Sequence, residues 1–179
     1  MHEARSPRDV VITTMTTARD WMTLPQQPLD VVFVPSAMGH ATSLGLGIAL
    51  AQPDRRVIVC NGDGSMLMNL GSLVSIVAAG APNLVVLVFE NGVYEVTGAQ
   101  PVPGAGVVDY AGMARAAGFT SVFDVDDLDV WRHDVQEILN APGPAFACVH
   151  VAPLEGVAGP KSPGPARDRA ARLIAALRT

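Results

Sequence analysis

Two short polar clusters follow apolar runs in this sequence, and their residue types suit a metal–phosphate site. Segment 62–65 (Gly-Asp-Gly-Ser) follows the apolar run 57–60, and Asn91 follows the apolar run 84–89. Such runs are typical of buried parallel strands, whose ends meet at one edge of a sheet. The Asp63 carboxylate and the Asn91 amide are oxygen ligands of the kind that Mg²⁺ prefers, with phosphate oxygens and water completing its octahedron. The pair therefore predicts a Mg²⁺–phosphate site.

The glycines on either side of the carboxylate also favour a bound diphosphate. Gly62 and Gly64 carry no side chain, so a phosphate can approach their backbone closely. Ser65 opens a predicted helix whose first amides attract negative charge. Asp-Gly or Asn-Gly alone is usually an ordinary turn. What favours ligand binding is their occurrence at the ends of two consecutive predicted strands.

The composition excludes several classes of partner. The chain has 179 residues, of which 49% are hydrophobic and 16% charged, and its net charge is −5. With a single lysine, Lys161, we expect no surface for nucleic acid or anionic lipid. Gly80 and Pro82 divide the apolar stretch 73–89 into a helix and a strand, each too short to cross a membrane. The N-terminal residues lack the apolar region of a signal peptide, and we expect a cytoplasmic protein.

Strand and helix patterns alternate along the chain. We expect strands near 10–14, 31–35, 57–61, 84–90, 121–125 and 145–151, and helices near 17–22, 41–51, 66–79, 110–117, 127–139 and 166–177. This alternation predicts an α/β fold with an open, mostly parallel six-stranded sheet and helices on both faces. Ligands of such sheets bind beyond the carboxyl ends of the strands, where Asp63, Asn91 and Ser36 lie.

Other features of the chain support a one-domain enzyme of a reducing compartment. Cys60 and Cys148 fall in predicted buried strands, as small core thiols do. Segment 92–108 is rich in glycine and proline and follows Asn91, as an active-site loop would. A third glycine is missing after the Gly-Asp-Gly segment, which argues against a dinucleotide-binding enzyme.

The chain resembles the diphosphate-binding domain of thiamin-diphosphate enzymes. The likeness rests on segments 13–20, 36–41, 62–69 and 91–100, and covers nearly the whole chain. Within that group it is most similar to the sulfopyruvate and phosphonopyruvate decarboxylases. The resemblance implies that residues 1–179 form one diphosphate-binding domain, with thiamin diphosphate and Mg²⁺ as cofactors.

The resemblance also implies roles for individual residues. Asp63, the Asn91 side chain and the Val93 carbonyl would ligate Mg²⁺. Met38 would wedge under the cofactor and hold it bent, a role that suits an unbranched apolar side chain. His40 is either a proton-transfer residue or a polar residue at a helix start. The implied cofactor contacts are Thr14, Thr16, Ser36, Met38, Gly62, Asp63, Gly64, Ser65, Asn91, Val93 and Tyr94.

Three positions depart from the pattern of the family. Glu90 stands where an asparagine is common, and Met15 replaces a frequent glycine. Tyr94 stands where the phosphonopyruvate enzymes tend to have histidine. An anionic substrate head group needs Arg or Lys donors. Segment 92–108 contains no basic residue, so either a partner subunit supplies the arginines or the substrate is a less charged 2-oxo acid. We favour the first alternative, with Lys161 as the one lysine that could reach over the site.

The resemblance implies that the chain is half of an active site. Thiamin catalysis needs a glutamate against the aminopyrimidine ring, and these enzymes take it from a separate pyrimidine-binding domain. One six-stranded unit leaves no room for that domain, so we expect a heteromer with a pyrimidine-binding partner subunit. We interpret the chain as a subunit of a lyase that decarboxylates a small 2-oxo acid to an aldehyde. The alternatives are a carboligase subunit related to acetolactate synthase and a binding module without turnover.

Overall fold

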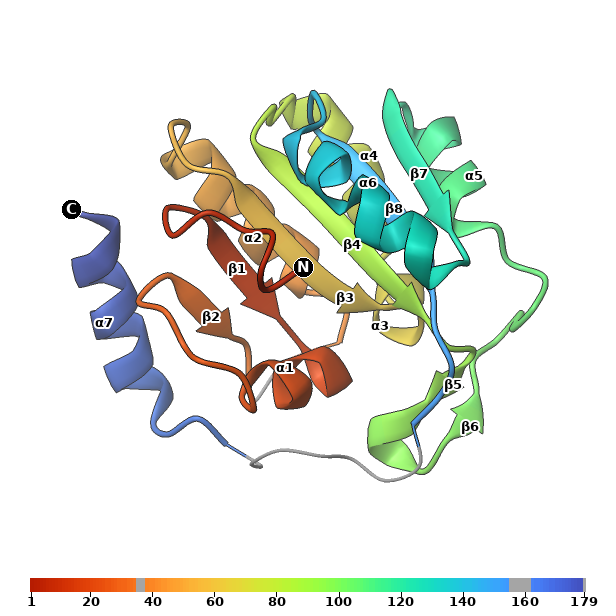
Figure 1. Cartoon of the computed structure of the whole chain (residues 1–179), viewed down its shortest axis with the longest axis horizontal. Coiled ribbons are helices and arrows are strands. Elements are labelled where there is room, and N and C mark those ends of the chain that lie inside the picture. The colour runs from red at the N-terminus through yellow and green to blue at the C-terminus, as the bar shows by residue number, and fades with distance from the viewer. Residues whose placement is uncertain (35–37, 155–161, 179) are drawn as a thin grey trace.

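The sheet that organises the molecule has all its strands parallel. In this computed structural model, residues 1–34, 38–154 and 162–178 are described. Within them a six-stranded sheet runs in the spatial order β2 (Asp30–Val32), β1 (Val10–Thr13), β3 (Val57–Gly62), β4 (Leu84–Glu90), β8 (Ala145–His150), β7 (Ser121–Val125). Every neighbouring pair is parallel (Figure 1). The predicted sheet is confirmed.

Helices cover both faces of the sheet, as predicted. They are α1 (Met15–Trp21), α2 (Ala41–Ala51), α3 (Asp63–Leu67), α4 (Gly71–Ala79), α5 (Tyr110–Ala117), α6 (Leu128–Asn140) and α7 (Ala166–Leu177). Buried residues of α2, α4 and α5 pack on one face of the sheet. Buried residues of α1 and α6 pack on the other face. None of the helices in the described ranges is long and apolar enough to cross a membrane.

The apolar runs are explained by this double cover. In β4, Leu84, Val86 and Val88 belong to the α2–α4–α5 core, while Val85 and Leu87 belong to the α1–α6 core. Successive side chains of a strand point to opposite faces, so a strand covered on both faces must be apolar at every position. The same alternation places Cys148 on the α5 side of the sheet and Cys60 on the α1 side, and both are free, buried thiols.

The predicted helix over 66–79 is divided into two helices. α3 ends at Leu67 and α4 begins at Gly71. Between them, the Asn69 side chain donates a hydrogen bond to the Gly39 carbonyl, 2.9 Å away. Asn and Gly are both weak helix formers, so a tertiary contact can interrupt the helix here. α3 also begins at Asp63, two residues before the start expected at Ser65.

The segment after Asn91 is more regular than an open loop. It contains β5 (Val93–Tyr94), the short 3-10 helix η1 (Glu95–Thr97) and β6 (Gln100–Pro101). β5 and β6 pair as an antiparallel hairpin. Farther along, α7 packs beside edge strand β2 (Figure 1), where Arg169 donates hydrogen bonds to the Val32 and Val34 carbonyls. Lys161 lies outside the described residues.

Candidate functional site

A cavity of about 390 Å³ opens at the carboxyl ends of β1, β3 and β4. The hairpin β5–β6 and helix α1 contribute to its walls. Its lining includes these residues singled out from the sequence: Thr14, Thr16, Met38, Gly62, Asp63, Gly64, Ser65, Asn91, Val93 and Tyr94. Ser36 lies outside the described residues, and His40 does not line the cavity. Four separate segments of the sequence thus come together in one place.

Asp63 is held at the base of the cavity by backbone amides. Its side chain is buried, and the residue is 3% exposed. Oδ1 accepts a hydrogen bond from the Gly64 N–H at 2.7 Å, and Oδ2 accepts one from the Gly92 N–H at 2.8 Å. Burial raises the pKa of Asp63, while these amides act in the opposite direction. A cation beside the carboxylate would offset this cost of burying its charge.

Asn91 is held beside Asp63 by the turn that follows β4. The Asn91 Oδ1 accepts a hydrogen bond from the Val93 N–H at 3.0 Å. Gly92 has φ +74°, a conformation in which glycine is favoured. The Gly92 carbonyl accepts a hydrogen bond from Val102, which closes the turn against the segment after β6. The turn therefore places the Asn91 carboxamide and residue Val93 on the lining of the cavity with the Asp63 carboxylate, and carboxylate and amide oxygens suit Mg²⁺.

The two glycines beside Asp63 serve different purposes. Among the described residues, no atom would lie within 4 Å of a Cβ on Gly62, and Gly62 has φ −99° and ψ 158°, which any residue can adopt. A Cβ on Gly64 would collide with the Tyr94 ring, whose Cδ1 would lie 2.6 Å away. Gly62 therefore keeps space open on the cavity wall, whereas Gly64 lets the Tyr94 ring pack against the backbone.

Two threonine hydroxyls at the end of β1 lie buried beside the cavity without a partner. Within the described part of the chain, Thr13 Oγ1 and Thr14 Oγ1 make no hydrogen bond, although both residues line the cavity. Buried hydroxyls are nearly always paired, so an unpaired one beside a cavity marks a place for a ligand acceptor. These hydroxyls, the space at Gly62 and the oxygens of Asp63 and Asn91 together fit a Mg²⁺-bound diphosphate.

The backbone conformation of the turn after β1 shows why glycine would suit position 15, where this chain has Met15. Met15 has φ +55°, in the left-handed region that glycine adopts at little cost. The Thr17 hydroxyl lies 2.7 Å from the Thr14 carbonyl and 3.0 Å from the Cys60 carbonyl, so these two acceptors share its single proton. These bonds tie α1 to β3 and hold Met15 in its unfavourable conformation.

Met38 lies on the cavity wall, and its position is fixed through its neighbour Gly39, whose backbone makes two hydrogen bonds. The Gly39 N–H donates to Ser65 Oγ at 3.0 Å, and the Gly39 carbonyl accepts from Asn69. Gly39 has φ +83°, and a Cβ there would lie 2.9 Å from the Asn69 Cβ. Ser65, predicted as a diphosphate contact, is therefore also a support for this turn. His40 is exposed at the start of α2, as in its helix-start interpretation, with Nδ1 3.3 Å from the Met38 carbonyl.

Much of the cavity wall was not anticipated from the sequence. Trp21 and Leu24 extend the wall along and just beyond α1, and the apolar lining continues with Phe89, Val96, Val151 and Leu154. Spacing was a usable signal, because positions 17, 20 and 21 share one face of the helix that starts at the candidate phosphate turn. The cavity is therefore lined by apolar side chains as well as by the candidate oxygen ligands.

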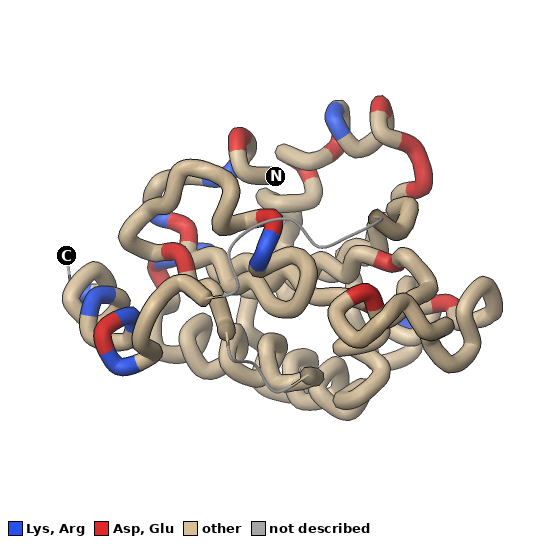
Figure 2. The backbone as a smooth tube through the Cα atoms, turned by 90° about the horizontal axis from the view of Figure 1, so that it is seen from below, with Lys and Arg blue, Asp and Glu red and all other residues tan. Residues whose placement is uncertain are grey.

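The charged side chains that line the cavity are acidic among the described residues. Asp20 and Glu95 line it, and no Lys or Arg does so among the described residues. Burial raises the pKa of Asp20, and the nearby Glu95 raises it further. The Glu95 carboxylate accepts a hydrogen bond from the Leu154 N–H at 2.7 Å. Figure 2 shows basic residues dispersed along the backbone, with a group on α7 near the C-terminus.

Two characterised proteins share sequence with this chain. A phosphonopyruvate decarboxylase from Streptomyces viridochromogenes is 39% identical over 162 residues, which are 88% of this chain and 40% of that protein. A sulfopyruvate decarboxylase subunit beta from Methanothermobacter thermautotrophicus is 41% identical over 121 residues, 68% of this chain and 62% of that protein. The chain thus spans about two fifths to three fifths of the length of these relatives.

Solved structures show the same fold. A 2-oxoglutarate:ferredoxin oxidoreductase from Magnetococcus marinus matches with a TM-score of 0.71 over 83% of this chain and 55% of that chain, at 15% identity. The family model described as "Thiamine pyrophosphate enzyme, C-terminal TPP binding domain" matches residues 9–149. That match includes β1, β3 and β4 and the turns that line the cavity. The chain belongs to the family of C-terminal TPP-binding domains of thiamine pyrophosphate enzymes.

Proposed function

We propose that this chain is the diphosphate-binding subunit of a two-subunit, Mg²⁺- and thiamin-diphosphate-dependent 2-oxo acid decarboxylase. The proposal rests chiefly on one observation. Unpaired threonine hydroxyls, a side-chain-free wall at Gly62 and the oxygens of Asp63 and Asn91 meet in a single cavity. The names of the two relatives support the reaction class.

Each group would hold one part of the cofactor. Asp63, Asn91 and the Val93 carbonyl would bind Mg²⁺, and Thr14 and Thr16 would donate hydrogen bonds to the diphosphate. Met38, fixed through Gly39, would support the cofactor from the wall. When bound, thiamin diphosphate would supply the carbanion stabilisation that loss of CO₂ from a 2-oxo acid requires.

The partner subunit would complete the site with a glutamate. Among the described residues that line the cavity, Glu95 is the one glutamate, and its carboxylate already accepts a hydrogen bond from Leu154. Glu95 also lies on the hairpin next to the Mg²⁺ ligands, so we assign the aminopyrimidine glutamate to the partner. The relative from M. thermautotrophicus is itself named a beta subunit.

The substrate would be a 2-oxo acid with an anionic head group, bound partly by the partner. Much of the cavity wall formed by the described residues is apolar, and the charged side chains on it, Asp20, Asp63 and Glu95, are acidic. A sulfonate or phosphonate needs paired Arg or Lys donors. Arginines of the partner subunit would therefore face this wall across the bound substrate.

Reconstitution tests the proposal. The purified chain is assayed for CO₂ release from sulfopyruvate and phosphonopyruvate, alone and with the pyrimidine-binding subunit, in the presence of Mg²⁺ and thiamin diphosphate. We expect turnover from the pair and none from either chain. Turnover by this chain alone would overturn the two-subunit arrangement. Acetolactate formed from pyruvate by the pair would instead support the carboligase alternative.

A further inference from the structure

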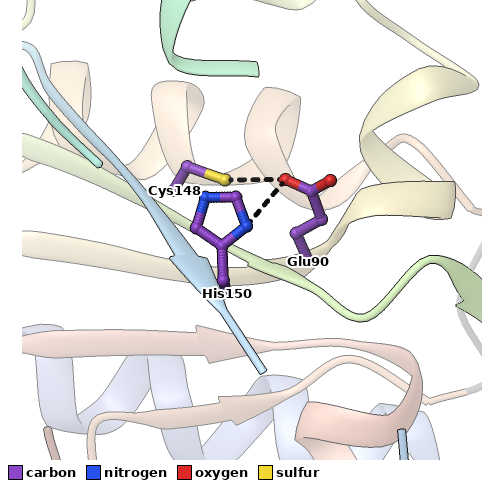
Figure 3. A group of neighbouring side chains, drawn as sticks. All are labelled: Glu90, Cys148 and His150. Atoms are coloured by element: carbon purple, nitrogen blue, oxygen red, sulfur yellow. Dashed lines mark hydrogen bonds and ion pairs between the residues drawn. The ribbon is translucent and has the colours of Figure 1, made fainter. Parts of the chain in front are cut away.

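Glu90, Cys148 and His150 form a compact group on the sheet next to the cofactor cavity. Figure 3 shows the three side chains converging from β4 and β8. Cys148 Sγ lies 3.2 Å from Glu90 Oε2, and His150 Nδ1 lies 3.5 Å from the same oxygen. One ligand atom of each residue lies within 4.8 Å of the other two. A thiol, an imidazole and a carboxylate are thus within reach of a single ion.

The sheet fixes this group rigidly. Cys148 and His150 are two residues apart on β8, so their side chains point to the same face. Glu90 pairs with His150 across the β4–β8 ladder, and Asp124 pairs with Cys148 across the β7–β8 ladder. The three ligand candidates and Asp124 therefore stand on one face of three adjacent strands. Groups held on strands keep their geometry better than groups held on loops.

Asp124 orients the imidazole for ligation. Asp124 Oδ1 lies 2.8 Å from His150 Nε2. An ionised carboxylate only accepts hydrogen bonds, so this contact requires the proton on Nε2. In the neutral ring, Nδ1 then keeps its lone pair, and Nδ1 is the nitrogen that faces Glu90. A carboxylate behind a histidine is the outer-shell arrangement of many zinc sites.

We propose that Glu90, Cys148 and His150 bind a divalent transition-metal ion such as Zn²⁺, at a site separate from that of Asp63 and Asn91. Zinc bonds of about 2.3 Å to sulfur and about 2.0–2.2 Å to nitrogen or oxygen, at tetrahedral angles, separate ligand atoms by about 3.4–3.6 Å. The 3.5 Å between His150 Nδ1 and Glu90 Oε2 lies within that range, and the 3.2 Å between Cys148 Sγ and Glu90 Oε2 is slightly shorter, so the three groups would need only a small adjustment to hold an ion. The inference does not depend on the proposed function.

The ligand set selects the metal. A thiolate with an imidazole favours Zn²⁺ and Co²⁺ over Mg²⁺, which prefers oxygen ligands alone. On binding, the thiol proton that Cys148 now donates to Glu90 would be released to solvent. Three protein ligands leave a fourth tetrahedral position open to water or another ligand. Because Glu90 directly precedes Asn91, the bound ion would also fix the strand end that carries this candidate Mg²⁺ ligand.

Cobalt titration tests the proposal on the purified full chain, stripped of metal with a chelator. We expect one Co²⁺ per chain with a thiolate-to-cobalt charge-transfer band, and displacement of that band by Zn²⁺. Cys148→Ser should abolish the band, and Cys60→Ser, at the other buried cysteine, should leave it unchanged. His150→Gln should weaken Co²⁺ binding, and Asp124→Asn should weaken it by about 10–100-fold as an outer-shell change.

Further variants keep the result unambiguous. His133→Gln, at an exposed histidine paired with Asp134, should have no effect on binding. Asp63→Ala should keep the band, because that residue belongs to the cofactor cavity. Since Asp124 and His150 are partly exposed, their variants should fold even if Cys148→Ser does not. Absence of the band in the unmodified chain, or its persistence at full strength in His150→Gln, would overturn the proposal.

Discussion

Replacing Gly62 by alanine should separate cofactor binding from stability. A methyl group there would meet no atom of the described residues within 4 Å, and Gly62 lines the cavity, so we expect the methyl group to occupy cavity space. Two small and opposite effects of this substitution change the free energy of unfolding. Alanine has less conformational entropy than glycine in the unfolded chain, which stabilises the folded state by about 0.4–1 kcal/mol. Gly62 is also the N-cap of α3, where alanine is worse than glycine by about the same amount. The net change in the free energy of unfolding should stay within about 1 kcal/mol.

The effect of Gly62→Ala on the affinity for the cofactor should be larger than its effect on stability. A methyl group on the wall would displace the diphosphate from one or two charge-assisted hydrogen bonds, worth about 1.5–3 kcal/mol each. Since about 1.4 kcal/mol is a tenfold change in Kd, affinity for thiamin diphosphate should fall by about 10–100-fold or more.

Gly64→Ala is the matched control, because its methyl would strike the Tyr94 ring. Overpacking of this kind costs about 1–3 kcal/mol of stability. Thermal denaturation without cofactor and titration calorimetry on the two-subunit complex measure the two effects. Unchanged affinity in Gly62→Ala would refute the placement of the diphosphate at this wall.

Three other predictions concern strain, acidity and substrate. Met15→Gly should raise stability by up to about 1 kcal/mol in chemical denaturation, because a left-handed backbone costs a non-glycine residue about 1–2 kcal/mol. Ala99→Gly, at φ +58° on an exposed residue, is its control, and a loss of stability in both variants would contradict the argument. Because the pKa of Asp20 is raised in the folded state, the folded chain binds more protons in the acid range, and this group destabilises the fold as pH rises. Asp20→Asn should therefore raise Tm at neutral pH and leave Tm unchanged at low pH. An equal rise in Tm at both pH values would contradict this assignment of the effect to the Asp20 charge. The two-subunit complex should decarboxylate sulfopyruvate or phosphonopyruvate faster than pyruvate or benzoylformate, as measured by CO₂ release, and the reverse order would contradict an anionic substrate.

The parts of the fold that follow from local sequence were predictable. The run over 84–90 is apolar at nearly every position, which is enough to indicate a strand covered on both faces, and β4 has these bounds. The break between α3 and α4 was not predictable in the same way. It depends on the bond from Asn69 to Gly39, which lies in a distant turn.

The candidate site also has parts that could be predicted from the sequence and parts that could not. Asp63 and Asn91 could be paired from the sequence, because β3 and β4 are consecutive along the chain and adjacent in the sheet. Glu90 and Cys148 could not be paired, because β8 lies between β4 and β7, an order that alternation of strands and helices does not specify. The distinct purposes of Gly62 and Gly64 likewise depend on where the Tyr94 ring packs.

The most direct test of the cofactor assignment is Mg²⁺-dependent binding of thiamin diphosphate by the two-subunit complex carrying Asp63→Ala. Loss of the only charged candidate ligand should reduce affinity by at least about 100-fold. This exceeds the loss of about 10–100-fold that follows when a residue merely supporting a metal ligand is removed. Asn91→Ala should weaken binding less. Asp20→Asn, which alters another acid on the same cavity wall, should leave affinity within about threefold of the unmodified complex, a margin of less than 1 kcal/mol. Equal affinities in Asp63→Ala and the unmodified complex would contradict the account.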